Sequence, residues 1–288
     1  MIIIIVFHII YHLEMSDSEA SGATIARNPP EVVDTKLPAG KLLKTRDLPG
    51  PAEKRPWHKV ALPVDALLLT VKDCEFLSCV SFLNRGFYKS FHKDLGHVYF
   101  GKINCAEGNT PLKIAITMCE MVPNGSTLAV KNTVTILKPK AVFCVGYCGG
   151  LSDKVKLGDV VISSKLITYS AIRVTASGIE NKGIGVPLNR HLANLILSAD
   201  AGWKPPLKDE VEVKVIKNGV FLSGPEVVDN EDRRAELIER FPDATAIEME
   251  GEGKIKVVEQ RVKSMSKAWQ GLSLANKLFF FTSKLRRR

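Results

Sequence analysis

Between residues 64 and 248 short apolar runs alternate with segments of helical periodicity, and this alternation restricts the folds open to the chain. Runs such as 64–71 and 141–150 have the length and composition of buried strands. By contrast, 125–139 and 230–242 place apolar residues at helical spacing. Strands that alternate with helices usually form one unit with a parallel or mixed sheet. We therefore predict an α/β fold.

Turn and cap residues mark the bounds of the other expected elements. A helix over 73–86 begins with Asp73 as its N-cap and ends on Gly86. Pro187 begins a helix that runs to Gly202. Asn230 caps the helix that stops before Pro242. The remaining expected strands are 96–103, 112–120, 156–170 and 211–224.

The formal net charge of +9 is concentrated at the C-terminus. Residues 254–288 contain ten Lys and Arg against one acid, which leaves 30 basic and 30 acidic residues in positions 1–253. The body of the protein is therefore neutral, and no specific nucleic-acid partner is predicted. Only the basic tail is suited to anionic surfaces.

The chain divides into three parts. Residues 1–58 form an apolar start and a disordered leader rich in Ser, Pro and Gly, 59–253 form the folded domain, and 254–288 form a basic, divergent tail. The apolar start is about thirteen residues long, shorter than the roughly 20 needed to span a bilayer. We expect residues 1–14 to have no structural role, with a weak signal peptide or anchor as the alternative.

Six cysteines are spread through the predicted elements without a paired CxxC spacing or a neighbouring His cluster. Reduced thiols in the core are the expected state, which favours a cytoplasmic protein. Neither a metal site nor a bound cofactor is predicted.

Four short motifs carry the candidate chemistry. Taken singly, each has an ordinary structural explanation, such as a Gly-rich turn or a solvated row of Glu side chains. In chain order they are "CVGYCGGL" (144–151), "KLGDVVISS" (156–164), "FLSGPEVVD" (221–229) and "AIEMEGEG" (246–253). Their order and spacing resemble the nucleoside phosphorylase superfamily, most closely 5′-methylthioadenosine/S-adenosylhomocysteine nucleosidases and hexameric purine nucleoside phosphorylases. The resemblance covers about residues 62–253.

This resemblance implies a three-layer α/β/α fold around a mixed sheet and cleavage of the bond between a purine and ribose. By motif position Glu250 is implied to hold the ribose hydroxyls as a catalytic residue, with Met249 against the ribose face. Glu248 is implied to frame the site, and the alternative for Glu248 is a structural carboxylate bound to backbone. A purine nucleoside is thus the expected partner, with phosphate as an optional co-substrate, in a homo-oligomer.

The same resemblance implies that Glu75 activates the attacking water. The alternative is that Glu75 is an acid in the first turn of a helix, favoured there by the helix dipole. The Gly-rich loop with Gly146, Tyr147 and Gly149 is implied to contact substrate. Tyr147 stands where the family usually has Ser or Thr, and its ring would crowd an anion pocket. This favours hydrolysis over phosphorolysis, or alternatively a different substrate.

The chain departs from the family pattern at two further places. Val227 and Val228 occupy the positions of a purine-stacking aromatic and its neighbour, and Val supplies no ring. No Asp follows Asp243, so the acid that protonates the purine in the family is missing, and the last strand and helix of the fold are expected to be lacking. A non-catalytic nucleoside-binding or interaction module is therefore the alternative to an enzyme. A third reading derives residues 254–288 from an altered transcript.

Overall fold

The structure is a computed structural model, and it describes residues 4–11, 43–50, 54–104, 110–119, 123–153, 155–156, 158–188, 193, 196–197, 213–249 and 251. For residues 4–11 and 123–129 only the backbone is described. The tail 254–288 lies outside these ranges. No helix in the described part is both long enough and apolar enough to cross a membrane.

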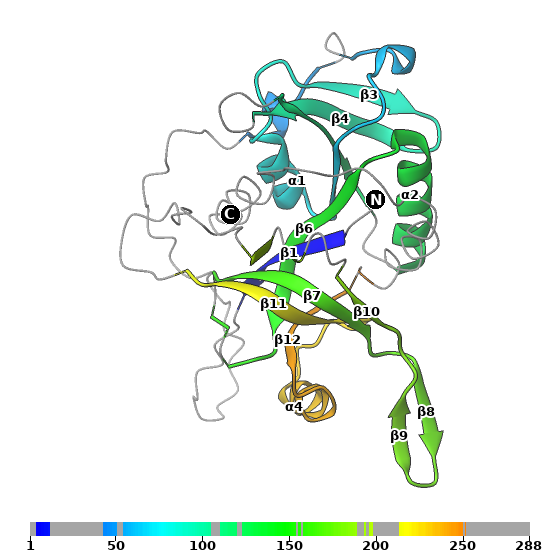
Figure 1. The fold of residues 1–288 in the computed structure, drawn as a ribbon, viewed down its shortest axis with the longest axis vertical. Helices are drawn as coiled ribbons and strands as arrows, with labels where there is room; N and C mark the ends of the chain where they lie inside the picture. Colours follow the sequence, from blue (N-terminus) through cyan, green and yellow to red (C-terminus); the bar gives the residue numbers. More distant parts are fainter. Residues whose placement is uncertain are drawn as a thin grey trace, which may run out of the picture.

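A mixed sheet of ten strands forms the centre of the protein (Figure 1). Its main path runs in the order β1-β7-β11-β12-β6-β2-β5-β4-β3, and β10 pairs with β7. The strands of this sheet are β1 (Ile4–Tyr11), β2 (Ala66–Thr70), β3 (Tyr88–His92), β4 (Gly96–Ile103), β5 (Leu112–Met118), β6 (Ala141–Gly150), β7 (Val160–Thr168), β10 (Gly185–Pro187), β11 (Val215–Ser223) and β12 (Ala244–Glu248). A separate hairpin of β8 (Ile172–Thr175) and β9 (Gly178–Asn181) projects from the body (Figure 1).

Two helices cover opposite faces of the sheet around β2 and β6. Alternate side chains of these strands, such as Phe143 and Val142, pack into two different clusters. The Phe143 cluster includes the apolar residues of α1 (Asp73–Val80), and the Val142 cluster includes those of α2 (Pro123–Leu137). Strands buried on both faces read as continuous apolar runs, as these two do. The α/β fold with a mixed central sheet is confirmed.

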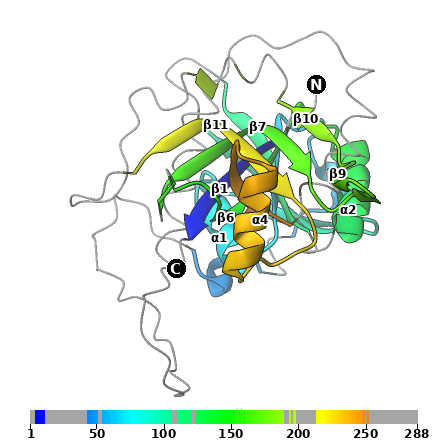
Figure 2. The same ribbon diagram turned by 90° about the horizontal axis from the view of Figure 1, so that it is seen from below.

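A third helix, α4 (Glu231–Arg240), packs on the part of the sheet that contains β11 and β12. In Figure 2 the molecule is seen from below, and α4 lies in front of the sheet. Its buried Leu237 belongs to a small core with Leu222, Ala244 and Ile247. The expected cap is confirmed, since the Asn230 side chain accepts a hydrogen bond from the backbone N–H of Arg233 at 2.8 Å.

Strand β1 closes part of the sheet into a ring of five strands. It pairs in parallel with β6 from Ile4 to Tyr11 and antiparallel with β7 from Phe7 to Ile9. Since β7, β11, β12 and β6 also pair in that order, the circuit is complete. The expectation that residues 1–14 have no structural role is therefore wrong for 4–11. Their partners lie more than 130 positions away, so local sequence could not reveal the pairing.

Parts of the predicted leader also contact the domain. Leu43 and Leu48 pack against the core, and the Leu43 N–H donates to the Ser81 hydroxyl at 2.9 Å. Trp57, in a short 3-10 helix over Trp57–Lys59, packs against the other core cluster. The leader is therefore not disordered at 43–50 and 54–58, because these partly buried apolar side chains pack against the domain.

Helix bounds differ from the prediction at two places. Helix α1 ends at Val80 rather than at Gly86, and its N-cap is Lys72, with Asp73 as the first helical residue. Pro187 closes strand β10 instead of beginning a helix. Most of the helix expected over 187–202 lies outside the described residues. Strand β3 was not predicted either, because its sequence YKSFH has little apolar content.

The ring makes a prediction about Ile9→Pro. Strand β1 has a neighbour on both sides at Ile9, so proline removes a ladder hydrogen bond within the sheet and leaves a partner carbonyl unpaired. We expect the free energy of unfolding to fall by about 2 kcal/mol or more in urea denaturation. Val174→Pro, in the exposed hairpin strand β8, is the matched control and should cost less. Equal losses in both variants would contradict the ring.

Candidate functional site

The site is centred on the buried carboxylate of Glu75, in the first turn of α1. This side chain is 4% exposed. Its Oε2 accepts hydrogen bonds from the N–H groups of Val71 at 2.8 Å and Lys72 at 2.9 Å. Oε1 accepts from the N–H of Tyr147 at 3.2 Å, in the Gly-rich end of β6. One carboxylate therefore accepts backbone N–H groups at the beginning of a helix and also binds the end of a strand 72 positions away.

This carboxylate lies at an interruption in the sheet. Strand β2 pairs with one edge of β6 as far as Cys144, and β12 pairs with that edge from Gly149 onward. Residues 145–148, the open interval of β6, therefore have no partner on this edge, while their other edge pairs with β1. Ligands in α/β proteins commonly bind at such breaks near the ends of strands. Glu75 contacts β6 within this interval.

Gly146 is required for the close approach. A Cβ atom added there would lie 2.7 Å from Glu75 Oε1, so the carboxylate would have to shift to admit any side chain. Burial, and then the charge of Glu75, raise the pKa of the Cys79 thiol well above its ordinary value. The sequence-predicted residues Glu75, Gly146 and Tyr147 are thus brought together. Gly149 lies further along β6, where a Cβ would lie 2.9 Å from Ile247.

The Tyr147 side chain turns toward α1. Its hydroxyl contacts the Sγ of Cys74, and its ring packs against the core cluster that includes Phe76. Cys74 is half-buried, and none of the five described cysteines forms a disulfide with another described residue. Cys105 lies outside the described residues.

Strand β12 ends at Glu248, in the same part of the sheet. Ile247 is opposite Gly149, so the next residues follow β6 back toward Tyr147. Glu248 is buried, and both of its carboxylate oxygens accept the N–H of Gly251, at 2.9 and 2.8 Å. This backbone-bound geometry is the structural alternative foreseen for Glu248. Met249 is half-buried, and Glu250 lies outside the described residues.

The loop that follows β11 approaches the end of β12. The N–H of Gly224 donates to the Glu248 carbonyl at 3.2 Å. Tyr169 is buried beside this loop, where a Cβ on Gly224 would lie 2.6 Å from its ring. Burial, and then the charge of Glu226, raise the pKa of Tyr169 to about 12. Tyr169 therefore packs between the loop that follows β11 and strand β12.

The structure does not place the two valines of this loop against the Glu75 carboxylate. Val227 is 77% exposed, and Val228 packs against the small core under α4. Their contact with a purine therefore stays a prediction.

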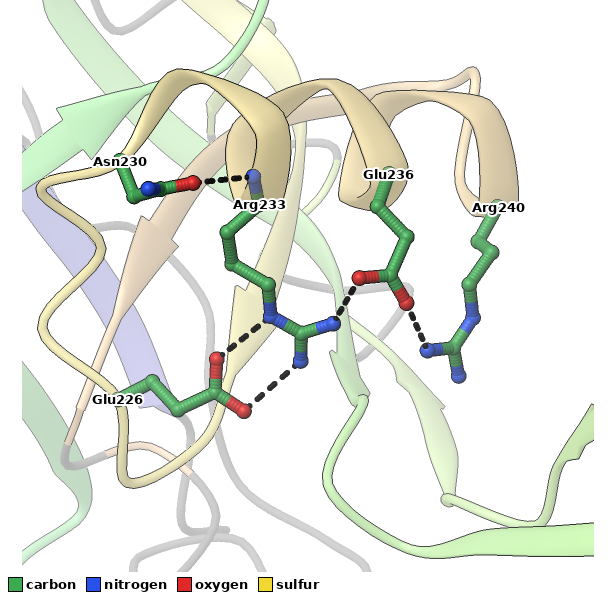
Figure 3. Close-up of polar contacts among 5 residues, drawn as sticks. All are labelled: Glu226, Asn230, Arg233, Glu236 and Arg240. Carbon is green, nitrogen blue, oxygen red and sulfur yellow. Dashed lines mark hydrogen bonds and ion pairs between the residues drawn. The ribbon is translucent and has the colours of Figure 1, made fainter.

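A chain of ion pairs holds the same loop to α4 (Figure 3). Glu226 accepts two hydrogen bonds from Arg233, each at 2.8 Å, in the bidentate geometry typical of Arg and carboxylate. Arg233 also donates to Glu236 at 2.6 Å, and Glu236 accepts from Arg240 at 3.3 Å. Hydrogen bonding, first to Glu226, raises the pKa of Arg233. The hydrogen bond from Arg233 is also the main cause of the lowered pKa of Glu236.

Helix α4 also contacts the Gly-rich strand end, because Arg234 donates to the Leu151 carbonyl at 2.8 Å. Sequence reasoning missed Tyr169, Arg233 and Arg234. Only the spacing of Arg233 and Glu236 on one helix face offered a signal, since i and i+3 side chains meet. Among the described residues, no group of three His, Cys, Asp or Glu side chains forms a candidate metal site.

Comparison with known proteins gives one family. The family model described as the phosphorylase superfamily matches residues 81–252. A death domain-containing ATP nucleosidase of Amphimedon queenslandica is 30% identical over 175 residues, which cover 54% of this chain and 32% of that protein. A 5′-methylthioadenosine/S-adenosylhomocysteine nucleosidase of Haemophilus influenzae is 27% identical over 153 residues, covering 53% and 62%. The chain thus spans less than two thirds of the length of these relatives.

Solved structures agree on the fold. A methylthioadenosine/adenosylhomocysteine nucleosidase of Colwellia psychrerythraea in complex with adenine superimposes with a TM-score of 0.55 at 19% identity, covering 69% of this chain and 78% of that one. The enzyme of Neisseria meningitidis in complex with methylthio-immucillin-A gives 0.57 at 17% identity, covering 77% and 94%. Futalosine hydrolase of Helicobacter pylori gives 0.52 at 18% identity, covering 69% and 79%.

The contact of Gly146 with Glu75 predicts the effect of Gly146→Ala. The new methyl group would displace the carboxylate and weaken its hydrogen bond to Tyr147. We expect the free energy of unfolding, measured in urea, to fall by about 1–3 kcal/mol. Gly50→Ala is the matched control, since no atom lies within 4 Å of a Cβ at Gly50. An unchanged stability of Gly146→Ala would contradict the assigned contact.

The ion pairs of α4 predict the effect of Arg233→Lys. Lysine keeps the charge but loses the two parallel hydrogen bonds to Glu226. Because both side chains are partly exposed, the stability loss should be only about 1 kcal/mol or less. Hydrogen exchange should nevertheless accelerate in residues 224–229. Arg173→Lys, on the exposed strand β8, is the control and should leave the exchange of residues 224–229 unchanged. An equal acceleration of residues 224–229 in both variants would refute the role of the Arg233–Glu226 ion pair.

Proposed function

The chain belongs to the phosphorylase superfamily. We propose that it hydrolyses the N-glycosidic bond of a purine nucleoside at the Glu75 junction, the place where the Glu75 carboxylate contacts residues 145–148 of β6. The observation that supports this best is the buried Glu75 carboxylate on the open interval of β6. Relatives named as methylthioadenosine/adenosylhomocysteine nucleosidases support an adenine nucleoside with a 5′ substituent as the substrate class.

In this proposal Glu75 is the general base. Hydrolysis needs a group within hydrogen-bond reach of the attacking water, and Oε1 of Glu75 faces the Gly-rich interval of β6. Because Glu75 also binds three backbone N–H groups, its position is fixed before substrate arrives. Water then attacks the anomeric carbon and its proton passes to Glu75. The bond to the purine nitrogen breaks, its electron pair leaves with the purine, and the purine takes a proton from solvent.

The ribose contacts follow from β12. Glu250 is proposed to accept hydrogen bonds from the two ribose hydroxyls, and Met249 to pack against the sugar ring. Glu248, whose oxygens are bound to Gly251, fixes the turn that presents them. The Tyr147 ring packs toward α1 and the core. The proposed preference for water over phosphate rests on the resemblance, since Tyr147 stands where the family usually has Ser or Thr.

A second function is favoured by one feature of the sequence. Residues 244–288 contain no Asp, and the resemblance implies an Asp after the "AIEMEGEG" motif that protonates the leaving purine. Leaving-group protonation typically contributes about 10²–10⁴ in rate. A nucleoside-binding module that keeps the ribose contacts but does not turn over would have this composition.

Release of free base distinguishes the two functions. The protein is incubated with methylthioadenosine, adenosylhomocysteine, adenosine, inosine or uridine, with and without phosphate, and the free base is quantified. We expect adenine from the 5′-substituted adenine nucleosides, at a rate independent of phosphate and slower than in enzymes that retain the acid. Glu75→Gln, checked for folding by circular dichroism, should abolish release. Nucleoside binding without base release would favour the binding module.

A further inference from the structure

A cavity of about 460 Å³ lies between the β3–β4 hairpin, the segment that follows α1 and the beginning of β5. None of the residues of the Glu75 junction lines it. Its volume is in the range of small-molecule sites, about 300–1,000 Å³. Four cationic residues line it, Arg55, Arg85, Lys102 and Lys113, and no acidic residue does.

Two of these cations are forced together by the sheet. Lys102 of β4 is directly opposite Lys113 of β5 in the antiparallel register, so both side chains leave the same face. Like charges in this arrangement are destabilising. A second like-charge pair lies nearby, where Lys54 bridges to Lys89 of β3. The fold therefore concentrates positive charge here even though residues 1–253 are neutral as a whole.

Among the described residues, no ion pair offsets the positive charge around this cavity. Within the described ranges, no carboxylate oxygen lies within 4.0 Å of a charged nitrogen of Arg55, Arg85, Lys102 or Lys113. Near the beginning of β5, Asp65 accepts the backbone N–H of Lys113 at 2.9 Å. Its carboxylate pairs with the ammonium group of Lys140 at 2.6 Å. A bound anion would supply the missing counter-charge.

The lining also offers fixed geometry and apolar surface. The Arg55 guanidinium lies 3.7 Å from the centre of the Tyr88 ring, which orients its donors by stacking. Its backbone is anchored as well, because its N–H donates to the Lys89 carbonyl at 2.9 Å. Phe87 and Phe100 complete an aromatic side of the cavity. A ligand with an anionic part and a planar apolar part matches this lining.

We propose that this cavity binds a small molecule that carries a polyphosphate, of the nucleoside triphosphate class. Two Arg and two Lys match three or four phosphate charges, and planar guanidinium groups bind phosphate oxygens in pairs. The ligand relieves the repulsion between Lys102 and Lys113, so its binding stabilises the folded protein. This site is separate from the cleavage site and does not depend on nucleosidase activity.

Calorimetric titration of the full chain with inorganic tripolyphosphate tests the site. The probe has no glycosidic bond, so the result is independent of whether the protein cleaves nucleosides. We expect one site per chain, with affinity that falls as salt rises. ATP should compete for this site, and adenosine should not, because the charges dominate recognition. No binding, or competition by adenosine equal to that by ATP, would overturn the proposal.

Variants of residues around the cavity locate the binding. Lys102→Met and Arg85→Gln should each weaken tripolyphosphate binding about tenfold, the loss of roughly one charge-assisted contact. Lys93→Met is the matched control, because Lys93 is an exposed residue of the β3–β4 turn outside the cavity. It should bind as the wild type does. Equal weakening in Lys93→Met would show general attraction to positive charge and overturn the site.

Thermal melting gives a readout that does not depend on affinity alone. Without ligand, Lys102→Met should melt at a higher temperature than the wild type, because it removes one member of the like-charge pair. Tripolyphosphate should raise the melting temperature of the wild type and of Lys93→Met, but scarcely that of Lys102→Met. A ligand-induced rise that is the same in all three proteins would contradict binding at this cavity.

Discussion

The structure depends on one buried carboxylate that serves two distant segments. Glu75 accepts the N–H groups at the start of α1 and also the N–H of Tyr147 in the Gly-rich end of β6. A buried charge of this kind is tolerated only when it is well hydrogen-bonded. Glu75 is therefore an acid in the first turn of a helix, as the structural alternative predicted. Its position on the open interval of β6 also makes it our candidate for the base that activates water.

The rest of the fold holds this junction in place. Strand β1 pairs with β6 along its length, and the ring through β7, β11 and β12 returns to β6 just beyond the open interval. Helix α4 binds the loop after β11 through Arg233 and the end of β6 through Arg234. The segments that approach the junction thus come from one closed set of strands and one helix.

Local sequence predicted what local forces decide. Strand β6 has the predicted bounds, and the side chain of Asn230 caps α4 as expected. Burial and capping depend on near neighbours, which is why these succeeded. Strand β1 and the Lys102 and Lys113 pair depend on register with distant strands, which no local pattern encodes. For the same reason, Glu75 could be placed in a helix turn but not against Tyr147.

A crystal structure of the protein with a nucleoside analogue that it cannot cleave, such as methylthio-immucillin-A, tests the central claim most directly. The account predicts that the nucleoside lies along residues 145–148 of β6, with its anomeric carbon facing Glu75 and its sugar against Met249. A nucleoside bound elsewhere, with Glu75 in contact with its backbone partners alone, would contradict the catalytic role of this junction and leave Glu75 a structural residue.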